Sequence, residues 1–182
     1  GGSAVDAAVA IQAVLGLVEP QSSGLGGGAF MMVFDAASGE ITSYDGRETA
    51  PAAATPELFY ENGRPLGIGE AILSGRSTGA PGVVAMLAMA QKAHGTLAWS
   101  ALFGDAERMA RDGFVVSPRM AGMIAITRGQ ARSRWANAWF TKPDGARYIA
   151  GDVLRNPAYA VTVAELAAGG PEVFYQGRPP PI

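Results

Sequence analysis

The segment that most constrains the fold is the predicted strand at 29–35, apolar from Ala29 to Phe34, directly after the glycine-rich loop at 24–28. In a strand, alternate residues point to opposite faces, and here both faces are apolar. Phe30, Met32 and Phe34 lie on one face, and Met31 and Val33 on the other. A strand of this kind is covered on both sides, which predicts a sheet lying between two other layers. A turn at 36–40 then leads into a second strand at 41–44.

Helices are expected before and after this hairpin. Ser3 followed by Asp6 resembles a capping box, which predicts a helix over residues 4–17. That helix is apolar on nearly every face, so we expect it to be buried on most sides. The other helices expected from capping residues, prolines and glycines are these: from Pro81 to Gly95, capped by Thr78 or Gly79; 98–111, capped by Thr96; after Ser117–Pro118; and after Asn156–Pro157 as far as Gly169.

Two segments are expected to be irregular. Residues 52–77 are rich in alanine, glycine and proline, which predicts at most one short helix, at 56–60. Residues 178–182 contain three prolines, which cannot continue a helix.

Composition limits the partners and the chemistry. With 16% charged residues and a net charge of −2, the chain predicts no polyanion-binding surface and no nucleic-acid partner. Its only basic cluster, Arg128, Arg132 and Arg134, suits a solvated helix end. The absence of cysteine excludes disulfides and thiolate nucleophiles within the chain. The longest apolar run, 7–18, is shorter than the ~20 residues of a membrane span.

Two short motifs have a functional and a structural interpretation. Residues 24–29 fit the dinucleotide pattern G-x-G-x-x-A, but here the predicted order is helix, glycines, strand, so close passage of backbone beside a cleft is favoured. Residues 75–79 match the nucleophile elbow G-x-S-x-G, but no acid lies between Ser77 and the single histidine, His94, so a turn into a helix is favoured. His94 is expected to serve the carbonyl end of its helix, and a lone histidine predicts no metal site.

Arg47 is the strongest candidate for ligand binding. It follows the second strand of the hairpin and lies between Asp45 and Glu48, next to Gly46. An arginine in this position suits bidentate binding of a carboxylate. A surface turn with a local ion pair accounts for the same residues equally well.

Eight segments together resemble the large subunit of the γ-glutamyltransferases, also called γ-glutamyltranspeptidases or glutathione hydrolases. They follow in the order of that subunit over nearly the whole chain: GGSAVDAAVA at 1–10, EPQSSGLGGG at 19–28, DGRETAP at 45–51, GAPG at 79–82, HGTL at 94–97, ARDGFVVSP at 110–118, GDVLRNP at 151–157 and GGPEVFY at 169–175.

The resemblance implies an α+β chain with the four-layer αββα fold of the N-terminal nucleophile hydrolases, incomplete in this chain. Residues 1–182 would be part of the large subunit, a single domain with both ends truncated. In the family, the arginine that corresponds to Arg47 binds the α-carboxylate of the γ-glutamyl group. Asp45 and Glu48 are expected to support the loop rather than to contact substrate. No cofactor and no metal are implied.

The resemblance also implies a partner. The family's nucleophile is a threonine that becomes the first residue of the small subunit when the precursor cuts itself, and its Thr-Thr-His segment does not occur in these 182 residues. The chain alone is therefore expected to be inactive. The implied partners are the small subunit, glutathione or another γ-glutamyl compound, and an amino acid, peptide or water as acceptor. The family suggests a periplasmic or extracellular location.

Two alternatives stay open. The same family resemblance covers acylases that remove glutaryl-type side chains from cephalosporins, which also need a carboxylate-binding group. The chain could instead belong to a non-catalytic subunit used for assembly or binding. Whether Thr-Thr-His follows downstream would distinguish this last alternative from an enzyme.

Overall fold

The structure is a computed structural model that describes residues 1–126 and 133–176. Its elements are α1 (Ala4–Val18), β1 (Phe30–Phe34), β2 (Ile41–Asp45), β3 (Tyr60–Glu61), β4 (Arg64–Pro65), α2 (Ile68–Leu73), the 3-10 turn η1 (Gly75–Ser77), α3 (Val83–His94), η2 (Trp99–Leu102), α4 (Gly104–Asp112), β5 (Phe114–Val115), α5 (Pro118–Ala125), α6 (Arg134–Trp139), β6 (Val153–Leu154), α7 (Pro157–Gly169) and α8 (Pro171–Gln176). The strands form three antiparallel pairs, β1–β2, β3–β4 and β5–β6. Arg128, Arg132 and the prolines at 179–181 lie outside the described residues.

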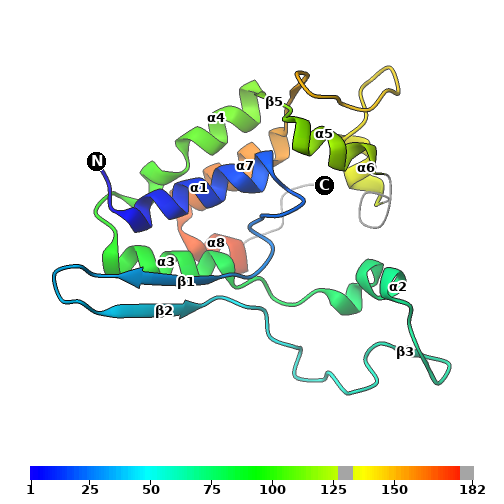
Figure 1. Ribbon diagram of the computed structural model, residues 1–182, viewed down its shortest axis with the longest axis horizontal. Helices are drawn as coiled ribbons and strands as arrows, with labels where there is room; N and C mark the ends of the chain where they lie inside the picture. Colours follow the sequence, from blue (N-terminus) through cyan, green and yellow to red (C-terminus); the bar gives the residue numbers. More distant parts are fainter. Residues whose placement is uncertain (127–132, 177–182) are drawn as a thin grey trace.

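Helix α1 packs with α3 and α4, and α7 lies beside it, joined by a hydrogen bond from Tyr159 (Figure 1). The predicted capping box is confirmed, because the Ser3 hydroxyl accepts from the Asp6 N–H and the Asp6 carboxylate accepts from the Ser3 N–H. The expectation of burial on most sides is confirmed. Val5, Val9, Ala13 and Leu17 are buried on one face, and Ala10 and Val14 pack against the same core. The exposed residues of the helix, Ala4, Ala7 and Ile11, lie along one narrow stripe.

The β1–β2 hairpin has the predicted alternation, with Phe30 opposite Asp45 and Phe34 opposite Ile41. Met31 and Tyr44 pack against the helical core. The other face is open, with Phe30, Met32 and Phe34 at least 65% exposed. Coverage of both faces, as expected from the sequence, is therefore not found within the described chain. The alternation identifies the residues that share a face, and it does not say what lies over that face.

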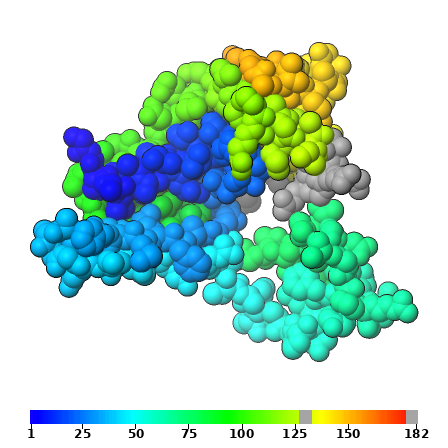
Figure 2. All heavy atoms as spheres, viewed as in Figure 1, coloured from blue at the N-terminus to red at the C-terminus, as the bar shows by residue number. Residues whose placement is uncertain are grey.

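Residues 52–79 form an arm that lies apart from the central helices (Figures 1 and 2). The expected helix at 56–60 is wrong: residues 56–59 form turns, Tyr60 begins β3, and the α-helix of the arm is α2, at Ile68–Leu73. The dipeptide Asn62–Gly63 explains the difference. Both residues have positive φ, 51° and 74°, as a tight hairpin turn requires, and they pair β3 with β4.

The later helices agree with the sequence in three places and disagree in one. Helix α3 ends at His94, although its cap is Gly82 and not Thr78 or Gly79. Helices α5 and α7 start at the predicted prolines, capped by Ser117 and Asn156. The single helix expected at 98–111 is wrong, because the chain breaks at Phe103 into η2 and α4. Thr96 does not cap this segment but donates two hydrogen bonds to Asp6.

No helix within residues 1–126 and 133–176 combines the length and the apolar character that crossing a bilayer requires.

Tyr159 of α7 joins that helix to α1, since its hydroxyl donates to the Ala13 carbonyl at 2.7 Å. Burial raises the pKa of this hydroxyl well above its ordinary value. We expect Tyr159→Phe to lower the free energy of unfolding by about 1 kcal/mol, the net contribution of one hydrogen bond. Denaturant unfolding of the intact protein measures this change. The control is Tyr60→Phe in the exposed arm, which should have little effect, and equal stability of the two variants would contradict the assignment.

Candidate functional site

Arg47 lies directly beyond the end of the hairpin. The β1–β2 pairing continues by one further pair, in which the Ala29 N–H donates to Gly46 O at 3.3 Å and the Gly46 N–H donates to Ala29 O at 2.9 Å. This pair places Arg47 beside the end of the glycine-rich loop, where its Nη1 donates to Gly28 O at 3.4 Å.

Asp45 and Glu48 both contact Arg47. The Asp45 carboxylate accepts a hydrogen bond from the Arg47 backbone N–H at 2.9 Å, a local turn that fixes the chain direction after β2. The Glu48 Oε2 atom lies 3.4 Å from Arg47 Nη2. The local ion pair expected from the sequence therefore exists, but half-exposed pairs of this kind contribute only about 0 to 1 kcal/mol to the stability of the fold.

The Arg47 guanidinium still has the capacity to bind a ligand. Its side chain is 55% exposed, and a guanidinium carries five N–H donors in a planar fork. A carboxylate can therefore approach it from solvent while Gly28 O and Glu48 hold it in place. The ion pair and a carboxylate site are compatible at this position.

Gly28 shows why the loop before β1 is rich in glycine. A Cβ atom at Gly28 would lie 2.7 Å from Gly46 O and 2.9 Å from Arg47 Cα, closer than atoms can approach. The loop follows helix α1 and precedes strand β1, which is the order that argues against a dinucleotide site. Its glycines permit close backbone contact with the Arg47 segment.

The other two candidates from the sequence are tied into local structure. Ser77 Oγ donates to the carbonyls of Ile72 and Ser74, as expected for a turn and not for a nucleophile elbow. The expectation for His94 is wrong: its Nε2 lies 2.8 Å from the Tyr44 hydroxyl, and the two rings meet edge to face. His94 therefore joins α3 to β2 rather than serving the carbonyls of its own helix.

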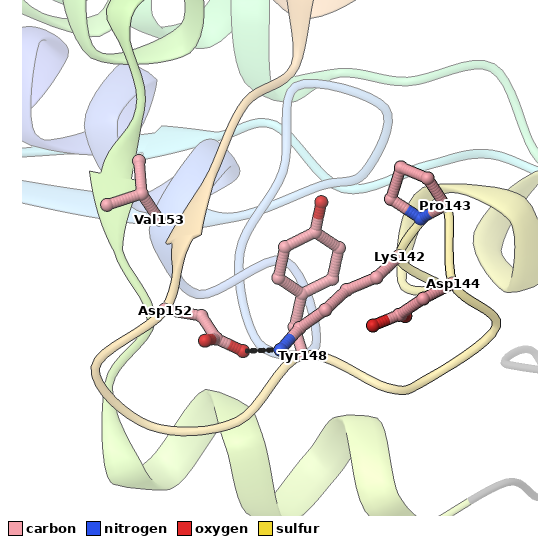
Figure 3. A pocket seen from close by; sticks show the side chains of 6 residues that line it. All are labelled: Lys142, Pro143, Asp144, Tyr148, Asp152 and Val153. Atoms are coloured by element: carbon pink, nitrogen blue, oxygen red, sulfur yellow. Dashed lines mark ion pairs between the residues drawn. The ribbon is translucent and has the colours of Figure 1, made fainter.

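A second polar cluster lines an open pocket of about 360 Å³ between α6 and β6 (Figure 3). Lys142 Nζ lies 2.6 Å from Asp152 Oδ2, and this hydrogen bond raises the pKa of Lys142. The Ile149 backbone N–H and Lys142 together lower the pKa of Asp152. Lys142 and Asp152 neutralise each other, but Asp144 also lines the pocket, so the cluster has a net negative charge and does not suit a carboxylate ligand. Its lining does not include the Arg47 segment.

The sequence missed the role of Asp6 beyond its capping box. Its buried carboxylate accepts hydrogen bonds from the Thr96 N–H, the Thr96 hydroxyl and the Leu97 N–H, all on Oδ2. It thereby fixes the loop after α3 to the start of α1. The HGTL segment at 94–97 was visible in the sequence, but nothing in it indicates Asp6 as its partner.

Comparison with known proteins gives one consistent family. The chain matches the sequence profile of the family described as Gamma-glutamyltranspeptidase over residues 1–179. It is 37% identical over 179 residues to the "Glutathione hydrolase proenzyme" of Bacillus subtilis (strain 168). That alignment covers 98% of this chain and 30% of the relative, so the chain spans about a third of the relative's length.

Solved structures similar to this chain include a member of the same family. The γ-glutamyltranspeptidase of Helicobacter pylori matches with a TM-score of 0.90 and 31% identity, over 98% of this chain and 51% of that chain. A cephalosporin acylase from Bacillus halodurans matches with a TM-score of 0.79 and 27% identity, over 97% of this chain and 33% of that chain.

Proposed function

The chain belongs to the γ-glutamyltranspeptidase family, and on this premise we propose that it forms part of the large subunit of an enzyme that transfers or hydrolyses γ-glutamyl groups. The substrates would be glutathione and other γ-glutamyl amides. The observation that carries the proposal is the half-exposed Arg47 guanidinium, held by Gly28 O and Glu48. In this proposal Arg47 binds the α-carboxylate of the γ-glutamyl group, and Asp45 and Glu48 support its loop.

The catalytic residues of the proposed reaction lie outside this chain. The hydroxyl of the small subunit's N-terminal threonine attacks the γ-carbonyl carbon, and the threonine's own α-amino group takes the hydroxyl proton. The C–N bond of the amide then breaks, the leaving amine takes up that proton, and a glutamyl ester of the threonine remains. Water or an amino acid acceptor cleaves this ester. Arg47 contributes by fixing the distance between the anchored carboxylate and the amide under attack.

The exposed apolar face of the hairpin is suited to a partner that packs a sheet of its own against it. Phe30, Met32 and Phe34 are exposed on one face, while the other face packs against the helical core. A second sheet laid on the open face would produce the inner two layers of an αββα fold, to which residues 1–182 contribute one part. We propose the small subunit as this partner, and the "proenzyme" name of the Bacillus subtilis relative is consistent with its release from a common precursor.

Processing of the full-length gene product tests the proposed mechanism. We expect mass spectrometry to find two chains, with threonine as the first residue of the smaller one, because self-cleavage exposes the nucleophile. Replacing that threonine with alanine should leave a single uncut chain. A single chain in the unaltered, purified protein would contradict the processing step and would favour a non-catalytic subunit.

The similarity to a cephalosporin acylase supports a second candidate activity, removal of a glutaryl-type side chain. A glutaryl group also ends in a carboxylate that Arg47 can bind, but it lacks the α-amino group of a γ-glutamyl substrate. The relative values of kcat/KM for a γ-glutamyl anilide and a glutaryl anilide distinguish the two. The family profile and the relative's name favour the γ-glutamyl substrate.

A further inference from the structure

The GAPG segment at 79–82 lies against residues 46–49, here called the Arg47 loop, although the two segments are about thirty residues apart in the sequence. The backbone N–H groups of Gly82 and Val83 both donate to Gly27 O at 3.1 Å. A Cβ atom at Gly82 would collide with the Gly46 carbonyl oxygen. Three segments therefore meet at the start of α3: the glycine-rich loop, the end of β2 and residues 79–82.

Gly79 makes the contact that matters for the guanidinium. A Cβ atom at Gly79 would lie 2.7 Å from Glu48 Cβ and 3.4 Å from Thr49 O. The φ angle of Gly79 is not in the left-handed region, so the restriction at this position is space and not backbone conformation. Only a residue without a side chain leaves Glu48 where it is.

Glu48 in turn contacts Arg47. Its Oε2 atom lies 3.4 Å from Arg47 Nη2, so a displacement of Glu48 removes one of the two groups that hold the guanidinium. Ordinary carbon–carbon contacts lie at about 3.5 to 4.0 Å, so a Cβ at Gly79 requires a shift of roughly 1 Å. A misplacement of this size at a substrate-binding group can cost up to about 100-fold in kcat/KM. Because Arg47 would hold the substrate without touching the bond that breaks, we expect this loss in KM and not in kcat.

We propose that Gly79 is a positioning residue for Arg47, acting through Glu48, and that it thereby sets the affinity for the carboxylate of a γ-glutamyl substrate. This inference rests on the function proposed above. In this proposal the 79–82 segment leaves space for Glu48 and acts on the carboxylate site only through Glu48, without contacting the substrate.

The test compares Gly79→Ala with Gly75→Ala in the full-length, processed protein. Gly75 lies in η1, four residues before Gly79, and apart from its two chain neighbours no atom of the described chain lies within 4 Å of a Cβ built there. We expect Gly79→Ala to raise KM for a γ-glutamyl p-nitroanilide about tenfold or more with kcat changed less than threefold, and Gly75→Ala to change neither. Equal KM values for Gly79→Ala and the unaltered protein would overturn the proposal.

A double variant separates positioning from general damage. In an Arg47→Ala background, Gly79→Ala should raise KM no further, because the group that it positions is gone. A further tenfold rise in that background would overturn the proposal. The Glu48→Gly variant lacks the Cβ that Gly79→Ala would collide with. Adding Gly79→Ala to Glu48→Gly should therefore raise KM no further.

Labelling keeps the test independent of the assigned function and of the activity of the variant. Phenylglyoxal modifies arginine, and peptide mass spectrometry gives the rate at Arg47. Gly79→Ala should change this rate at least threefold while Gly75→Ala does not, and an unchanged rate would overturn the proposal. If Arg47→Ala leaves KM unaltered but labelling responds to Gly79→Ala, the carboxylate role of Arg47 fails while the positioning contact stands.

Discussion

Arg47→Ala in the full-length, processed protein is expected to raise KM for a γ-glutamyl substrate and to lower kcat/KM by about 30-fold to several thousand-fold. The range follows from roughly 2 to 5 kcal/mol for truncating a charged, hydrogen-bonded contact. The guanidinium can supply two parallel N–H donors to the substrate carboxylate, and alanine supplies none. Arg47→Lys retains the charge but loses the fork, so we expect an intermediate loss. Steady-state kinetics with a γ-glutamyl p-nitroanilide measure both variants.

The matched control is Arg108→Ala. Arg108 lies on α4, is 63% exposed and pairs with Asp105, so it resembles Arg47 in exposure and in having an acidic neighbour. It is remote in sequence from the Arg47 loop, and its replacement should leave KM and kcat unaltered. An unchanged kcat/KM for Arg47→Ala would disprove the assignment of Arg47 as the carboxylate-binding residue.

Asp6→Ala is expected to cause the largest loss of stability, lowering the melting temperature by about 5 to 10 °C. The Asp6 carboxylate is buried, and one of its oxygens accepts from Ser3, Thr96 and Leu97. Its removal leaves these donors without their acceptor and releases the loop after α3 from the start of α1. Thermal unfolding of the intact protein measures the change. The control Asp105→Ala concerns an exposed acid in the first turn of α4 and should change the melting temperature by about 2 °C or less.

The contribution of Asp6 should depend on pH. Burial alone would raise the pKa of this carboxyl, but hydrogen bonds from Thr96 and Ser3 outweigh burial and hold the pKa well below its ordinary value. The folded protein therefore favours the charged form. The stabilisation is complete above the unfolded-state pKa of about 3.9 and is lost as the pH falls through the lower folded-state pKa. The difference in melting temperature between the unaltered protein and Asp6→Ala should be constant near pH 7 and shrink below about pH 4. A difference that stays constant down to pH 2 would contradict this role.

Several elements could be predicted because their signals lie within a few residues. The capping box of Ser3 and Asp6, the cap of Ser117 and the alternation of 30–34 each depend on neighbours three or four positions away or fewer. The turn at Asn62–Gly63 belongs to the same class, since an Asn-Gly dipeptide by itself favours a two-residue hairpin turn. The break at Phe103 falls directly before Gly104, a poor helix former, so it too has a local signal. Phe103 itself is 2% exposed and packs against Trp99, with ring centroids 4.9 Å apart.

The sequence by itself determined the hairpin, the place of Arg47 at its end and the acidic residues on either side, since these follow from local order along the chain. The tertiary structure decided the rest. It brought Gly79 against Glu48 and Thr96 against Asp6, and it left one face of the hairpin open. Contacts between residues tens of positions apart depend on the whole path of the chain, which no local pattern specifies. The glycines at 79 and 82 were therefore visible as a motif, and only packing showed that they leave space for the arginine loop.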